Sequence, residues 1–182
     1  MEAAEKNGRG RNIPWRILGW GGAASILLLP LVANAPWTLS DFVVMGVLLG
    51  IVGAALELAV AASRSGGYRA GAAVAVVAAF LLVWVNLAVG FLGNEGNPAN
   101  LMFVGVISIA LAGSFVAGSD AARMARAMLA TAAAQIAVGA VALAAGLASP
   151  GNRGLYEVVM GTGLFAGLWL ASAWLFRRAG SR

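Results

Sequence analysis

The chain has 182 residues, of which 61% are hydrophobic and only 10% are charged, and its mean hydropathy is +0.88. A soluble domain carries about 25% charged residues, so this composition excludes an ordinary soluble fold and predicts an integral membrane protein. The absence of cysteine and histidine excludes disulfides, thiol nucleophiles, iron–sulfur clusters and the commonest haem ligand.

Six apolar runs follow one another along the chain, each near the roughly 20 residues that a helix needs to cross a bilayer. Short polar stretches separate them, so neighbouring helices should form antiparallel hairpins. The runs cover residues 17–35, 42–62, 70–92, 101–118, 124–147 and 155–176. The sequence therefore predicts an all-α fold, a polytopic membrane bundle of six transmembrane helices.

Basic residues gather on one side of the predicted spans. With the N-terminus in the cytoplasm, eleven lysines and arginines lie inside and Arg153 alone lies outside. This bias predicts that both termini are cytoplasmic. The chain then comprises a basic N-terminal segment (residues 1–16), a six-helix domain (17–177) and a short basic tail (178–182). The net charge of +5 indicates anionic lipid at the cytoplasmic face as a partner, and no nucleic acid.

The first span has an alternative interpretation. Its basic start, its apolar run and the triplet Ala33-Asn34-Ala35 also resemble a secretory signal with a cleavage site. Pro36 directly afterwards disfavours cleavage, so we expect the span to be retained. Cleavage would leave five spans and an outside N-terminus.

Small residues predict which helix faces point inward, because helices in lipid associate through close backbone approach and interhelical hydrogen bonds. Three faces have helical spacing and are expected to be buried. They are Gly46, Gly50, Gly53, Glu57 and Ala61 in the second span, Thr131, Gln135, Gly139, Ala142 and Gly146 in the fifth, and Gly163, Gly167 and Ala171 in the sixth.

Helix starts have suitable capping residues. Ser40 and Ser119 are expected to cap the second and fifth helices, and Asn97 precedes Pro98, a residue suited to a first helical turn. The asparagines of residues 93–100 are therefore expected to be turn and cap residues.

Glu57 is the first candidate for a functional residue, because a carboxylate inside a span costs several kcal/mol, with estimates from about 2.5, unless it is paired or hydrated. It lies five residues before the end of its run, about 7.5 Å from the inner edge, and Arg64 follows on the same face. The residue is either part of an ion pair that ties helices together or a proton or cation site.

Asn86 and Gln135 are polar residues inside the third and fifth spans. We expect them to form hydrogen bonds across helices, and the alternative is a polar path for a solute. Asp41, Glu95 and Glu157 form a sparse acidic outer rim, which is either a mouth that attracts cations or a set of solvated helix ends.

Two intramembrane chemistries are excluded. A serine protease needs a base, and the chain has no histidine. An aspartyl protease needs two aspartates within the membrane, whereas Asp41 and Asp120 are expected at opposite interfaces. The sequence therefore predicts no catalytic residue, no cofactor, no metal site and no enzyme.

The third and fourth spans carry two short elements, Trp84-Val85-Asn86 and Asn97-Pro98-Ala99-Asn100. These elements resemble an uncharacterised family of small bacterial multispanning inner-membrane proteins, and the resemblance covers about the middle half of the chain. It implies a bacterial inner (plasma) membrane and supplies no activity.

Two functions follow from these expectations. The first is a non-enzymatic scaffold or accessory subunit in the bilayer, acting as a homo-oligomer or with another membrane protein. The alternative is a small proton- or cation-linked transporter or channel in which Glu57, Gln135 and Asn86 provide polar steps. Broken helices usually mark carrier sites, and Pro30 is the one proline inside a predicted span, which disfavours a carrier.

Overall fold

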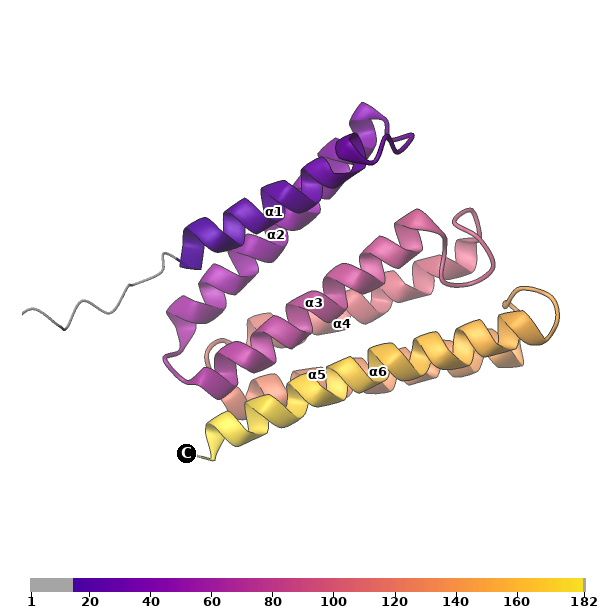
Figure 1. The fold of residues 1–182 in the computed structure, drawn as a ribbon. Coiled ribbons are helices and arrows are strands. Elements are labelled where there is room, and N and C mark those ends of the chain that lie inside the picture. Colours follow the sequence, from indigo (N-terminus) through magenta and orange to yellow (C-terminus); the bar gives the residue numbers. More distant parts are fainter. Residues whose placement is uncertain (1–14, 182) are drawn as a thin grey trace, which may run out of the picture. The chain divides into compact units, whose positions relative to one another are not determined.

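The computed structural model describes residues 15–181, and all regular structure in this part of the chain is helical. Each of the six predicted apolar runs forms a helix (Figure 1). Most of the basic segment 1–16 lies outside the described residues. The elements are α1 (Trp15–Val32), α2 (Leu39–Ala62), α3 (Gly66–Ala88), the short 3₁₀ helix η1 (Pro98–Leu101), α4 (Met102–Ala117), α5 (Ala121–Ala144) and α6 (Asn152–Gly180).

Within residues 15–181, five helical segments are long and apolar enough to cross a membrane. They are Leu39–Ala62, Gly66–Ala88, Pro98–Ala117, Ala121–Ala144 and Arg153–Gly180, whereas the apolar stretch Gly19–Val32 of α1 is shorter. A multipass membrane protein fits this set of helices. The sixth span and the side of the membrane on which each terminus lies stay predictions.

The chain divides into two compact units, Met1–Gly53 and Ala54–Arg182, so that α2 begins in one and ends in the other. In the first unit α1 and α2 run antiparallel. A Cβ at Gly46 would lie 3.8 Å from Leu27, and one at Gly53 would lie 2.6 Å from the indole of Trp20. The predicted small-residue face of the second span thus packs against α1 at these two glycines.

The second unit holds the large hydrophobic core, to which α3, α4, α5 and α6 contribute. Helix α6 packs on both α3 and α5, and α4 packs on α5, whereas α3 and α4 scarcely touch each other. The largest fully buried side chains include Trp169, Phe176, Leu82, Leu92 and Met128. The bundle is therefore closed along three of its helix pairs and open along the fourth.

Helices α5 and α6 approach each other at small residues along their antiparallel seam. A Cβ at Gly139 would clash with Thr162, and one at Gly180 would lie 3.6 Å from Ala121. The two contacts are separated by the same number of residues on α5 as on α6, so the two helices keep the same register from one contact to the other. The predicted inward face of the fifth span is confirmed at four positions, which are Thr131, Gln135, Gly139 and Ala142, and Gly146 is exposed.

The prediction for the sixth span is wrong. Gly163, Gly167 and Ala171 are exposed, and a Cβ on either glycine would meet nothing within 4 Å. The buried face of α6 instead carries Phe165, Trp169 and other large side chains. Close approach needs a small residue on only one of two facing helices, and here α5 and α3 supply it.

Polar residues at the helix ends satisfy free backbone groups. At the start of α2, Thr38 N donates to the carboxylate of Asp41 (2.7 Å), and Asp41 N donates to Thr38 Oγ1 (3.4 Å), which makes a reciprocal capping box. Asp120 caps α5 by accepting a hydrogen bond from Arg123 N (2.8 Å). The predicted caps Ser40 and Ser119 are therefore wrong, because each has a better-placed oxygen close by.

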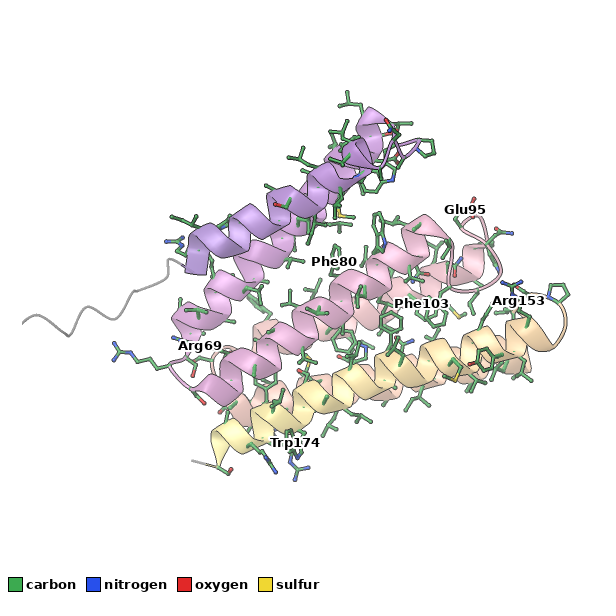
Figure 2. The ribbon with its side chains drawn as sticks, viewed as in Figure 1. Arg69, Phe80, Glu95, Phe103, Arg153 and Trp174 are labelled. Atoms are coloured by element: carbon green, nitrogen blue, oxygen red, sulfur yellow. The ribbon has the colours of Figure 1, made fainter. Side chains whose placement is uncertain are left out.

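Arg69 links α3 to the end of α2. Figure 2 shows Arg69 and Trp174 at one end of the second unit and Glu95 and Arg153 at the other. The side chain of Arg69 donates to the carbonyl oxygens of Ser63 (2.8 Å) and Val60 (3.1 Å), so it caps the last turn of α2. This hydrogen-bonded cap holds the connection between α2 and α3.

Candidate functional site: the groove between α3 and α4

The loop that follows α3 reverses the chain sharply. Val89 N and Gly90 N both donate to the carbonyl oxygen of Val85, and Gly90 has a φ of +73°. A Cβ at Gly90 would collide with the backbone of Asn94. Only glycine fits a turn that combines positive φ with this close approach.

Two asparagines hold the loop against the start of α4. Asn100 is buried, and its side chain accepts from Leu92 N (2.8 Å) and donates to the carbonyl of Asn94 (2.7 Å). Asn97 caps η1 by accepting from Ala99 N (3.0 Å), and it donates to the carbonyl of Leu92 (3.0 Å). The prediction that these asparagines are turn and cap residues is confirmed.

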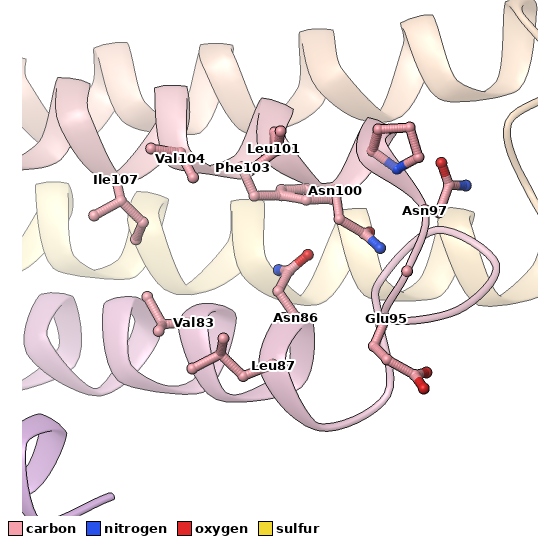
Figure 3. A pocket seen from close by; sticks show the side chains of 12 residues that line it. Val83, Asn86, Leu87, Glu95, Asn97, Asn100, Leu101, Phe103, Val104 and Ile107 are labelled. Carbon is pink, nitrogen blue, oxygen red and sulfur yellow. The ribbon is translucent and has the colours of Figure 1, made fainter. Parts of the chain in front are cut away.

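A groove of about 540 Å³ lies between α3 and α4 beneath this loop. Its walls are mainly aliphatic and aromatic, and the loop closes one end. Figure 3 shows Val83 and Leu87 on the α3 side facing Phe103, Val104 and Ile107 on the α4 side. The remaining lining residues are Asn86, Glu95, Gly96, Asn97, Pro98, Asn100 and Leu101.

Asn86 places a polar atom inside this apolar groove. Its amide nitrogen donates to the carbonyl of Leu82 within α3 (2.7 Å). Its Oδ1 is buried and has no hydrogen-bond partner among the described residues. Figure 3 shows the carboxamide directed from α3 toward Asn100 and Phe103. A buried carbonyl oxygen without a donor costs about 1–3 kcal/mol, so a ligand with a donor would gain by reaching it.

The three residues of the predicted acidic rim have separate surroundings. Glu95 is exposed beside the groove, with its carboxylate turned away from it in Figure 3. Glu157 forms a 3.0 Å ion pair with Arg153, and Asp41 caps α2 with Thr38 in the first unit. No group of three or more acidic side chains in the described part of the chain could hold a metal ion.

Gln135 is fully buried on α5. Neither its amide nitrogen nor its oxygen has a partner among residues 15–181, and the same holds for Thr162 Oγ1 and Trp169 Nε1. Sequence reasoning missed the last two. For Thr162 the available signal was Gly139, which lies one helical turn after Gln135 on the same face. A glycine at such a position indicates that a side chain of another helix packs closely against it.

Glu57 belongs to a different part of the molecule. It is half-buried and is engaged in a polar or electrostatic interaction. Five residues after it α2 ends, and α3 begins at Gly66. Asn86 lies twenty residues farther along α3, about 30 Å from that start. The residues that line the groove include Asn86 but neither Glu57 nor Gln135.

Two of the hydrogen bonds that cross between elements come from residues the sequence did not single out. Ser172 Oγ on α6 donates to the carbonyl of Gly71 on α3 (2.8 Å), and Tyr68 Oη donates to the carbonyl of Gly118 (3.1 Å). The expectation that Asn86 and Gln135 do this is wrong for the described residues. A serine among apolar residues of α6 was the available signal for Ser172.

No family model, curated protein or solved structure matches this chain.

Proposed function

We propose that the protein is a non-enzymatic membrane protein of six spans that binds a small amphiphilic molecule in the groove between α3 and α4. In this role it serves as a binding or accessory subunit in a bacterial inner membrane, with both termini in the cytoplasm. The observation that carries the proposal is the buried, unpartnered Oδ1 of Asn86 inside an apolar groove.

The size of the groove favours a small molecule over a partner helix. Its volume of about 540 Å³ is within the range of roughly 300–1,000 Å³ that small-molecule sites have. Along α4 it extends from Phe103 to Ile107, which is about 6 Å of helix. A membrane-spanning helix of a partner protein is much longer than this and could not continue past the loop that closes one end of the groove.

The lining defines the chemistry of the ligand. Val83, Leu87 and Ile107 favour an apolar body, and Asn86 Oδ1 requires an N–H or O–H donor. Of the residues around the groove, Glu95 alone is titratable, and carboxamides are poor acids and bases. The site is therefore suited to binding rather than to proton transfer or nucleophilic attack.

The binding test compares dodecanol with dodecyl methyl ether, which lacks the hydroxyl donor. Native mass spectrometry of the purified full chain in mild detergent measures how much of each probe is retained. Wild type should retain the alcohol roughly five- to tenfold better, the effect of about 1–1.5 kcal/mol for one hydrogen bond. Asn86→Leu should remove this preference, because the buried acceptor without a partner is then gone from the groove.

A second pair of variants tests the place of binding. Val104→Trp fills the groove, whereas Val116→Trp adds the same side chain at an exposed position of α4 outside it. Val104→Trp should abolish retention of both probes and Val116→Trp should not. Equal retention by the two variants, or no preference for the alcohol in wild type, would refute the proposed site.

The six-span topology has its own test, since the chain has no cysteine. Single cysteines replace Asn7, Asn94 and Ser119 in otherwise native protein, and intact cells are treated with a membrane-impermeant maleimide. Only Asn94→Cys should react before permeabilisation. Reaction of Asn7→Cys from outside would show five spans instead.

A small proton-linked transporter is the second candidate, because Gln135, Thr162 and Trp169 leave polar atoms unpartnered inside the bundle. Such atoms would be hydrated along a solute path. Proton flux into proteoliposomes should then fall several-fold in Glu57→Gln and in Gln135→Leu. Flux equal to that of empty liposomes in wild type would exclude this candidate.

A further inference from the structure

Two adjoining hollows lie over the seam between α5 and α6, at the end of the bundle where α5 begins and α6 ends. Their volumes are about 420 Å³ and 450 Å³, and both are lined by Leu129, Arg177 and Ser181. Arg126 borders one of them, and Trp174 and Arg178 border the other. The hollows are remote from the groove between α3 and α4, which lies next to the loop at the opposite end.

The hollows are strongly basic. Three arginines line them, and neither is lined by a carboxylate. The acidic side chain nearest in sequence is Asp120, which pairs with Arg123 at 3.8 Å and caps α5. Among the described residues, Asp120 forms its ion pair with Arg123 and Glu157 forms its ion pair with Arg153, so neither of these pairs uses Arg126 or Arg177. Guanidinium groups with free donors are suited to phosphate, which they bind with paired hydrogen bonds.

An apolar floor continues from the arginines toward the middle of the helices. It consists of Leu129, Leu170 and Ala173, and Ala122, Ala125 and Gly180 leave room for a ligand near the arginines. The guanidinium carbon of Arg178 lies 3.7 Å from the centroid of the Trp174 ring. Tryptophan beside a cation at the end of an apolar helix is typical of the interface where lipid headgroups lie.

We infer that these hollows form a binding site for one anionic phospholipid. The phosphodiester lies between Arg126, Arg177 and Arg178, and an acyl chain follows Leu129 and Leu170. A free phosphate would use the arginines alone, whereas the apolar floor beside them favours a lipid. The inference rests on the membrane location but not on the groove between α3 and α4, so each can fail without the other.

The first test uses the full-length protein in nanodiscs of phosphatidylcholine with a small fraction of phosphatidylglycerol. Native mass spectrometry measures the phosphatidylglycerol retained on release. The double variant Arg126→Gln/Arg177→Gln should retain it roughly tenfold less, since each basic residue near a lipid surface contributes an appreciable attraction. Arg64→Gln/Arg123→Gln removes the same charge from residues that line neither hollow and should lose less than about half. Equal losses in the two double variants would show diffuse attraction and overturn the site.

A second variant keeps every charge. Leu129 lines both hollows and is 40% exposed, so Leu129→Trp should fill them and reduce retention by a similar factor without altering net charge. Retention equal to wild type would overturn the site. Inorganic phosphate at millimolar concentration is added as a competitor. Full displacement of the lipid by phosphate would indicate a free-anion site and overturn the assignment to lipid.

Discussion

The bundle contains two helix pairs of similar composition that behave in opposite ways. Helices α5 and α6 are in close contact along their length, whereas α3 and α4 diverge around a groove. Both pairs are joined by short loops and both are rich in alanine, valine and leucine. The comparison shows that apolar composition does not by itself close a helix pair in this protein.

The difference lies in how size is distributed across each interface. In the closed pair, Gly139 of α5 lies against Thr162 of α6, and Gly180 of α6 lies against Ala121 of α5, so each of these contacts has a glycine on one side. In the open pair, the small residues point elsewhere. Gly67 and Gly71 of α3 face α6, and Gly113 of α4 faces Ala127 of α5. Each helix of the open pair is thus packed against the closed pair and not against its partner.

The largest expected effect is at the centre of the closed pair. Trp169 has no exposed surface, and Trp169→Ala would leave a cavity between α5 and α6. We expect a loss of about 3–5 kcal/mol in the free energy of unfolding, measured by denaturant titration in mild detergent. The control is Trp174→Ala on the same helix, where the side chain is half exposed. A smaller loss at Trp169 than at Trp174 would contradict this account of the seam.

Overpacking the closed pair should cost less. A side chain at Gly139 would collide with Thr162, whereas one at Gly163 would meet nothing within 4 Å. Gly139→Leu is therefore expected to destabilise the protein by about 1–3 kcal/mol, and Gly163→Leu should change stability little. Thermal unfolding followed by circular dichroism would measure both. Similar midpoints for the two variants would mean that the seam adapts to added volume.

In the open pair, substitutions should distinguish Asn100, which holds the loop, from Asn86, whose oxygen has no partner. Asn100→Ala removes the partner of Leu92 N and of the Asn94 carbonyl and should cost roughly 1–3 kcal/mol. Asn86→Leu removes an unpartnered oxygen and one bond within its own helix. It should change stability by less than about 1 kcal/mol. The opposite order would show that Asn86, not Asn100, holds the pair together.

The smallest effect concerns the start of α5 and depends on pH. The hydrogen bond from Arg123 N, helped by the nearby arginines, lowers the pKa of Asp120 below its usual value. Its folded pKa is thus below its unfolded pKa, so its contribution is complete above about pH 4. That contribution is lost as the pH falls through the folded pKa. Asp120→Asn keeps the capping oxygen without titrating, so the stability difference from wild type should shrink in acid. A difference that is constant with pH would refute this.

Much of the fold followed from local patterns. The six apolar runs became six helices whose ends moved by only a few residues, and five of the helical segments have the length and composition needed to cross a membrane. The turn role of Asn97 and Asn100 followed from their position before a proline and a helix start. The prediction that Ser40 and Ser119 are caps failed, because Thr38 and Asp120 nearby have equivalent side-chain oxygens. The capping preferences of Ser, Thr and Asp are too similar to tell which residue caps the helix.

The candidate site was foreseen only in part. Asn86 was identified as a costly polar residue inside a span, but the groove it lines depends on how far α3 and α4 diverge. Thr162 and Trp169 gave no signal of their own, since one is a common residue in apolar helices and the other is common at interfaces. Their unpartnered atoms emerge only from the register between α5 and α6.

The sequence by itself determined that this is a helical protein suited to a membrane, because hydropathy and length are local properties of each segment. It also determined which ends of the helices carry arginine. Only the tertiary structure decided that Gly163, Gly167 and Ala171 face outward and that the gap opens beside Asn86. Packing depends on which helix supplies the small residue at each contact, and that choice is made between helices rather than within one.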